Sequence, residues 1–173
     1  ATKGKVSLSD LPSLQGLIVR RCCDIAACIP EVNVYSQGTR INLKSCVSVS
    51  KAYPPLYAYA AMLGAVENTL TYLDLGERWK CVVFAKDPDS PPTPSFVNAV
   101  RCDEGGPFVD CIANPLNLKV RKNIQSKTNV KLSKSEVQAR LGVCIVSLIE
   151  NPAFRTQTKD YCTSLASEWG SEP

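Results

Sequence analysis

The chain has 173 residues, 45% of them hydrophobic and 21% charged, which is typical of a globular chain with one buried core. Histidine is absent, which excludes a Ser-His-Asp triad, a Cys-His pair and any histidine-ligated metal site. The formal net charge of +4 is too small to indicate an acidic partner by itself, so the distribution of the basic residues matters more than their number.

The cysteines do not form a disulfide or zinc pattern. Their number, nine, is odd, Cys22 and Cys23 are adjacent, and no Cys-x-x-Cys pair occurs. We therefore expect reduced thiols that mostly fill the core, and no metal site. The first ten residues lack the apolar region of a signal peptide, and no apolar run approaches the ~20 residues of a membrane span, so no membrane partner is expected.

Helical periodicity dominates the first part of the chain. Ser9 or Asp10 can cap a helix that runs over residues 11–29, with Asp24 off the centre of its apolar stripe, and Pro30 ends the run. Alternating residues on both sides of a turn at residues 36–39 predict a β-hairpin. The Pro54-Pro55 pair that follows predicts a break in regular structure.

The second part of the chain predicts strands over residues 69–75, 79–85 and 95–101, from their alternation and β-branched residues. Pro107 can open a helix that runs to about residue 122 with an interruption at Pro115, and residues 133–136 resemble the capping box of a last helix that continues to Ile149. A strand meander with helices before and after it predicts an α+β fold, with one sheet and helices on one face.

A polar loop, residues 150–159, follows that last apolar run. Pro152 cannot continue a helix, so the chain leaves the packed element there. Residues 155–159 read Arg-Thr-Gln-Thr-Lys, and they offer two cations, an amide and two hydroxyls to one anionic ligand. A solvated loop without a ligand would have the same composition.

The spacing Asn-Pro-x-Phe-x-x-Gln-Thr-Lys over residues 151–159 resembles the transducer domain of type IIA DNA topoisomerases. Three further stretches occur in the family's order. Residues 19–26 are similar to its first transducer helix, residues 95–110 to its central strand and Gly-Gly turn, and residues 148–152 to the helix end before its phosphate loop. The spacings are those of the eukaryotic type, host or viral, and the resemblance covers roughly residues 10–160.

The resemblance implies a fold and a domain assignment. The fold is a four-stranded mixed sheet backed by helices on one face, as in a ribosomal small-subunit protein, with a left-handed β-α-β crossover. Residues 1–173 would form one transducer domain, a fragment of a longer chain from which the ATP-binding and DNA-cleavage domains are absent. Phe108 stands where the family usually has a histidine.

The resemblance also implies a function. Gln157 and Lys159 would touch the γ-phosphate of an ATP that the preceding domain of the same chain binds, with magnesium in the parent enzyme. No catalytic residue is expected in this fragment. The transducer would couple ATP binding and hydrolysis to gate closure and DNA passage in a homodimer, in the nucleus or at a viral replication site in the cytoplasm.

Double-stranded DNA is the second expected partner, because basic residues cluster between residues 119 and 140. The family's lysine-rich loop corresponds to residues 123–131, and we expect Lys122, Lys127 and Lys131 to contact phosphates. A stand-alone DNA-binding module of the same fold, without catalysis, is the alternative interpretation. That module would have no reason to keep Gln157 and Lys159 at their positions.

Overall fold

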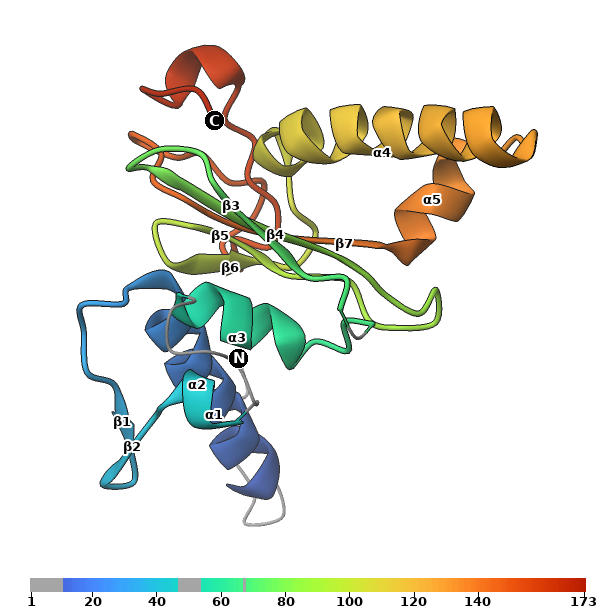
Figure 1. Ribbon diagram of the computed structural model, residues 1–173. Helices are drawn as coiled ribbons and strands as arrows, with labels where there is room; N and C mark the ends of the chain where they lie inside the picture. The colour runs from blue at the N-terminus through green and yellow to red at the C-terminus, as the bar shows by residue number, and fades with distance from the viewer. Residues whose placement is uncertain (1–10, 47–53, 67) are drawn as a thin grey trace, which may run out of the picture.

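A central five-stranded sheet organises the structure, a computed structural model that describes residues 11–46, 54–66 and 68–173 (Figure 1). The strand order is β3-β4-β7-β5-β6, and all pairings are antiparallel except that of β5 with β7. The strands are β3 (Thr71–Asp74), β4 (Trp79–Ala85), β5 (Ser95–Val97), β6 (Val100–Cys102) and β7 (Leu141–Ser147). The strands predicted over residues 69–75 and 79–85 are confirmed. The hand of the crossover that joins β5 to β7 stays a prediction.

The expectation of four strands is wrong, partly because residues 95–101 form two strands. Asn98 and Ala99 adopt left-handed φ angles of 50° and 60°, and they make a two-residue turn between β5 and β6. Alternation does not reveal this turn, since alanine is an unexpected residue at positive φ.

The expectation of a helix that continues to Ile149 is also wrong. The capping box is confirmed: the Glu136 amide donates to Ser133 Oγ at 3.2 Å and the Ser133 amide donates to Glu136 Oε2 at 2.7 Å. The helix that it opens, α5 (Lys134–Arg140), ends where β7 begins. β7 lies between β4 and β5 and is buried along almost its whole length. A strand covered on both faces has a continuous apolar sequence, which periodicity cannot distinguish from a buried helix.

Helices cover both faces of the sheet, not one face as expected (Figure 1). On one face lie α1 (Leu11–Cys28), α2 (Leu43–Cys46) and α3 (Pro55–Ala61), and on the other lie α4 (Pro107–Thr128) and α5. β4 supplies both cores, because Val82 and Phe84 pack with α1 and α3 while Trp79 and Cys81 pack with Phe108 of α4.

The prolines do not break the helices as predicted. Pro55 is the first residue of α3, a position where its missing amide hydrogen is not needed. α4 runs through Pro115, which lies on the exposed side of the helix, where water can reach the carbonyl that loses its partner.

Helix α1 is confirmed, while its predicted capping residues Ser9 and Asp10 lie outside the described residues. The hairpin is confirmed with short strands, β1 (Tyr35–Ser36) and β2 (Thr39–Arg40). A single 3-10 turn, Ala166–Glu168, lies near the C-terminus. Four cysteines fill the cores: Cys81, Cys102, Cys144 and Cys162. Within the described ranges, no helix is long and apolar enough to cross a membrane.

Candidate functional site

The polar loop leaves the sheet from a fixed point at the end of β7. The Asn98 side chain accepts from the Ile149 amide at 2.9 Å and donates to the Ile149 carbonyl at 2.9 Å. Asn151 then takes a left-handed φ of 46° before Pro152, so the chain turns away from the sheet. The root of the loop is thereby tied to the turn between β5 and β6.

The loop is a short hairpin with an ordered tip. The Arg155 amide donates to the Tyr161 carbonyl at 3.1 Å, and Phe154 and Cys162 form an antiparallel bridge. At the tip, residues 156–159 close a turn in which the Lys159 amide donates to the Thr156 carbonyl at 3.1 Å. These hydrogen bonds order the backbone of the tip and so set the directions in which its side chains leave the loop.

Gly105 and Gly106 support the returning arm of this hairpin. The Cys162 amide donates to the Gly105 carbonyl at 3.0 Å, and the Glu104 amide donates to the Asp160 carbonyl at 2.9 Å. Gly106 has a φ of 147°, and a Cβ atom there would lie 2.3 Å from the Cys162 carbonyl oxygen. Gly106 is therefore required by the close approach of the hairpin to the start of α4, while the left-handed φ of 72° at Gly105 favours glycine there.

Only some of the polar tip residues are free to bind an anion. Arg155 forms an ion pair with Glu104 and lies 4.9 Å over the Tyr161 ring. The Thr156 and Thr158 hydroxyls bond each other at 2.7 Å.

Gln157 and Lys159 remain, and both are exposed. The Lys159 ammonium lies 5.3 Å from the centre of the Phe154 ring, and no carboxylate in the described part of the chain pairs with it. The same turn thus presents one unpaired cation and one amide to solvent.

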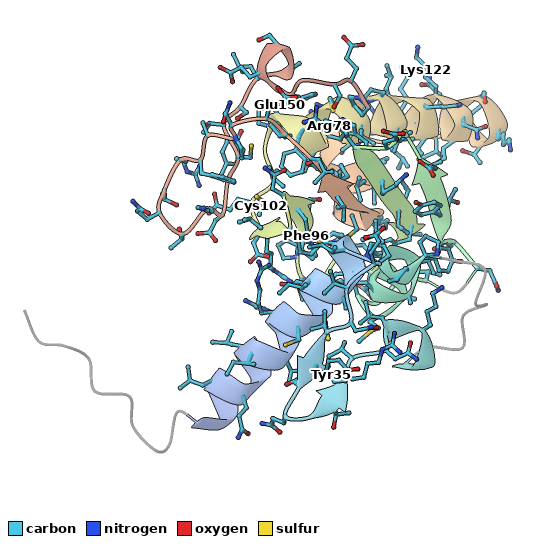
Figure 2. The ribbon with its side chains drawn as sticks, turned by 90° about the vertical axis from the view of Figure 1, so that its left-hand side faces the viewer. Tyr35, Arg78, Phe96, Cys102, Lys122 and Glu150 are labelled. Carbon is cyan, nitrogen blue, oxygen red and sulfur yellow. The ribbon has the colours of Figure 1, made fainter. Side chains whose placement is uncertain are left out.

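Arg78 links the root of this hairpin to the C-terminal segment (Figure 2). Its guanidinium donates to the Leu148 carbonyl at 3.0 Å, to Glu150 Oε1 at 2.9 Å and to the Gly170 carbonyl at 3.3 Å. Next to it, Trp169 is buried against Trp79, with ring centres 5.2 Å apart. The root of the hairpin and the segment around Trp169 and Gly170 are therefore held together by the same side chain.

The basic segment lies on α4 and the loop after it. Lys122, Lys127 and Lys131 are all exposed, and Figure 2 shows Lys122 projecting outward from the helix. Arg121 faces inward, because its guanidinium donates to the Leu132 carbonyl at 2.9 Å and holds the loop against the helix. Arg121 is therefore less available to a ligand than the three lysines.

Two residues differ from what the sequence suggested. Phe108 is completely buried in the core beside Trp79, so the position where the family has histidine serves packing here. Asp24, expected off the apolar stripe, is only 1% exposed and accepts from the Tyr59 hydroxyl at 2.6 Å. Burial and this hydrogen bond raise the pKa of Tyr59.

Arg101 completes the cluster around Asp24. Its guanidinium lies 3.3 Å from Asp24 Oδ1 and 3.0 Å from the Tyr59 hydroxyl, and its Nε donates to Asp103 at 2.7 Å. Asp103 directly precedes Glu104, which holds the hairpin. No local pattern predicts this link, because Asp24 and Arg101 are far apart in the chain.

Known proteins resemble this chain over the region that contains the sheet, the polar hairpin and the basic segment. A family model described as DNA gyrase B matches residues 61–168, more than half of the chain. The chain belongs to the DNA gyrase B family. The matched range in this DNA gyrase B family member contains the sheet, the polar hairpin and the basic segment.

Other members extend the likeness to nearly all of the chain. DNA topoisomerase 2 of Saccharomyces cerevisiae is 27% identical over 164 residues, which are 90% of this chain and 11% of the relative. DNA topoisomerase 2 of Arabidopsis thaliana is 31% identical over 160 residues, 90% of this chain and 10% of the relative. The chain thus spans about a tenth of the length of these relatives. The resemblance to the eukaryotic type of type IIA topoisomerase is confirmed.

Solved structures of the family share the fold. The ATPase region of Saccharomyces cerevisiae topoisomerase II superposes with a TM-score of 0.73 at 25% identity, over 98% of this chain and 40% of that one. The ATPase and transducer domains of DNA topoisomerase II from Balamuthia mandrillaris give a TM-score of 0.74 at 26% identity, over 97% and 40%. This family member therefore has the mixed α+β fold of part of that region.

Proposed function

We propose that this chain is the transducer of an ATP-dependent type IIA DNA topoisomerase. It couples the binding and hydrolysis of ATP to gate closure and to the passage of one DNA duplex through another. The observation that carries the proposal is the hairpin tip, where Gln157 and Lys159 remain free while Arg155 and both threonines are already engaged.

The tip has the chemistry to sense a terminal phosphate. The Lys159 ammonium forms a charge-assisted hydrogen bond with a γ-phosphate oxygen, and the Gln157 amide donates to another. Hydrolysis and release of the γ-phosphate remove this hydrogen-bond partner, and the Lys159 ammonium then no longer binds the nucleotide. The switch is therefore set by one phosphate group.

The contacts around the hairpin carry the displacement inward. Asn98 ties the root of the loop to the sheet, Gly105 bonds its returning arm, and Arg78 joins its root to the C-terminal segment. Because these contacts are hydrogen bonds to backbone groups, the hairpin moves with the domain and not independently of it. A displaced tip thus reorients the transducer as a body.

The proposed function requires binding partners outside this chain. ATP and Mg²⁺ are bound mainly by an ATP-binding domain of the same parent protein, the parent works as a homodimer in the nucleus, and double-stranded DNA lies against Lys122, Lys127 and Lys131. The alternative, a DNA-binding module without catalysis, is favoured only by the exposure of those three lysines.

Relaxation of supercoiled plasmid by the full-length parent protein separates the two functions. We expect the linking number to change in steps of two when ATP is present and not when ATP is omitted. DNA binding without any ATP-dependent change in linking number would contradict the transducer proposal and support the alternative.

ATP binding by the 173-residue chain alone is expected to be negligible. One exposed lysine and one amide cannot hold a triphosphate, because the proposal assigns the adenine and most phosphate contacts to an ATP-binding domain of the parent protein. Isothermal titration calorimetry with MgATP should show no heat of binding. A micromolar dissociation constant would mean that this chain contains a complete nucleotide site.

DNA binding through the three lysines is expected to be sensitive to salt but not to sequence. Each phosphate contact contributes about 0.9 to the salt slope on B-DNA, so replacing Lys122, Lys127 and Lys131 with alanine should flatten the slope by roughly 2 to 3 log units per log unit of salt. Fluorescence anisotropy of labelled duplexes of unrelated sequence measures this effect, at low salt or in the dimeric parent.

The control for this experiment is Arg40→Ala. Arg40 is exposed on β2, at the opposite end of the molecule from α4 (Figure 1). Its replacement should leave the salt slope unchanged. An unchanged slope in the triple variant would remove α4 from the DNA path.

A further inference from the structure

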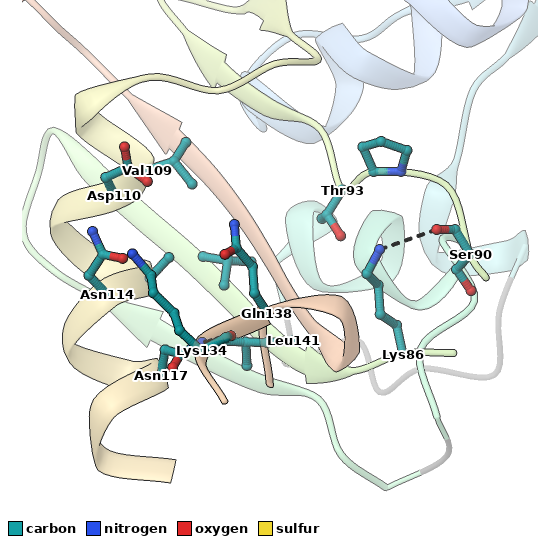
Figure 3. A pocket seen from close by; sticks show the side chains of 13 residues that line it. Lys86, Ser90, Thr93, Val109, Asp110, Asn114, Asn117, Lys134, Gln138 and Leu141 are labelled. Atoms are coloured by element: carbon teal, nitrogen blue, oxygen red, sulfur yellow. Dashed lines mark hydrogen bonds between the residues drawn. The ribbon is translucent and has the colours of Figure 1, made fainter. Parts of the chain in front are cut away.

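A cavity lies between α4, α5 and the loop that joins β4 to β5 (Figure 3). Its volume is about 310 Å³, and Leu141 and Val143 at the start of β7 contribute apolar wall. Polar side chains reach it from all three segments: Lys86, Thr93, Asp110, Asn114, Lys134 and Gln138. The proposed roles in ATP sensing and DNA binding use none of them.

Asn117 is a buried wall residue whose hydrogen bonding is incomplete. Only 4% of it is exposed, and its Nδ2 donates to the Lys134 carbonyl at 2.9 Å. Its Oδ1 has no hydrogen-bond partner among the described residues. Because buried acceptors in folded proteins are nearly always satisfied, this atom calls for a donor from a molecule in the cavity.

The charges around the cavity favour an anion. The Lys134 ammonium has no acceptor or carboxylate partner in the described part of the chain. The Lys86 ammonium donates to the Ser90 carbonyl at 3.3 Å and to the Pro91 carbonyl at 3.0 Å, which leaves one of its three N–H groups free. Asp110 is the one acidic wall residue, so the two lysines leave one positive charge in excess.

We propose that this cavity binds a small hydroxylated anion, such as a polyol phosphate or a hydroxy acid. The anionic group binds the Lys134 ammonium, and a hydroxyl group donates to Asn117 Oδ1. Thr93, Asn114 and Gln138 offer both donors and acceptors to the remaining hydroxyls. An anion without a hydroxyl, or a polyol without a charge, satisfies only half of these groups.

The site is distinct from the surface proposed for DNA. Asp110, Asn114 and Asn117 recur at spacings of four and three residues, so they share one side of α4 that faces the cavity. Lys122 projects outward from the helix, as Figure 2 shows. Occupancy of the cavity would therefore be independent of the salt-dependent binding of DNA.

Titration of the 173-residue chain tests this proposal. Glycerol 3-phosphate and malate are added separately and followed by calorimetry and by amide NMR shifts, with glycerol and sulfate, which has no hydroxyl at neutral pH, as controls. We expect at least one of the two hydroxylated anions to bind at least ten times more tightly than either control. The shifts should centre on Thr93, Asn117 and Gln138, and the stronger of the two ligands identifies the anionic group.

Matched variants locate the binding. Lys134→Ala should weaken it roughly 10- to 100-fold, as expected for the loss of a charge-assisted hydrogen bond. Lys119→Ala removes the same charge from an exposed position of α4 that does not line the cavity, and it should leave the binding unchanged. Asn117→Leu removes the unsatisfied acceptor, and a thermal melt checks that this variant is folded.

Three results would overturn the proposal. They are equal binding of glycerol or sulfate, an unchanged dissociation constant in Lys134→Ala, and absence of binding by both hydroxylated anions at millimolar concentration. Since Lys134 is exposed at the start of α5, its variant folds whether or not Asn117→Leu does.

Discussion

Replacement of Lys159 by alanine in the full-length parent protein is expected to slow ATP hydrolysis roughly 10- to 100-fold. A charge-assisted hydrogen bond is worth about 1.5–3 kcal/mol, and its loss in the transition state lowers the rate by that factor. Lys159 has no carboxylate partner among the described residues, so the alanine variant loses the phosphate contact without freeing another charge. A coupled assay of phosphate release measures the rate, and DNA cleavage at the gate should be largely spared.

Arg155→Ala is the matched control on the same hairpin. It also removes one cation, but one that is already paired with Glu104 and exposed to solvent. Exposed ion pairs contribute about 0–1 kcal/mol, so this variant should hydrolyse ATP within roughly fivefold of the wild-type rate. Wild-type hydrolysis by Lys159→Ala, or an equal loss in both variants, would contradict the role of Lys159.

Replacement of Arg101 by alanine is expected to lower the free energy of unfolding by about 3 kcal/mol. Asp24 is almost completely buried, and without Arg101 its carboxylate keeps the Tyr59 hydroxyl but no cation. Removing one partner of a buried ion pair typically costs about 3–5 kcal/mol, and the partial exposure of the Arg101 side chain places the expected value at the lower end. Urea denaturation followed by tryptophan fluorescence measures the change.

Lys80→Ala provides the comparison for this variant. The Lys80 ammonium bonds Asp74 at 2.6 Å, but the two side chains are 34% and 59% exposed, and the loss should be about 0–1 kcal/mol. The double variant Asp24→Leu, Arg101→Met should be less destabilised than Arg101→Ala, since it leaves no buried charge unpaired; the Asp103 carboxylate, which also loses Arg101, is partly exposed to solvent. Similar losses of unfolding free energy in Arg101→Ala and Lys80→Ala would show that the buried ion pair stabilises the fold no more than the exposed one.

The elements that the sequence predicts correctly each have a single clear hydrophobic pattern. Helix α1 and strand β4 follow directly from helical spacing and from a β-branched run. β7 was mistaken for a helix because a strand buried on both faces lacks alternation. The same reasoning, applied to the apolar run at residues 81–85 of β4, predicts helices on both faces of the sheet.

The candidate site was predictable only in part, because its geometry depends on contacts between distant residues. The resemblance to the family singles out Gln157 and Lys159 as phosphate-binding residues. Composition alone does not, because Arg155 and the two threonines could bind an anion equally well. The pairing of Arg155 with Glu104 distinguishes these residues, and it arises from the packing of the hairpin against Gly105. Such a contact has no local sequence signal, and the same holds for the pairing of Asp24 with Arg101.

Amide hydrogen exchange in the hairpin, residues 154–162, tests most directly whether this element senses the terminal phosphate. The full-length parent protein is compared in the presence of a non-hydrolysable ATP analogue and of ADP. We predict slower exchange at the tip with the analogue only, and loss of this difference in Lys159→Ala. Equal exchange with the analogue and with ADP in the wild-type protein would contradict phosphate sensing by this hairpin.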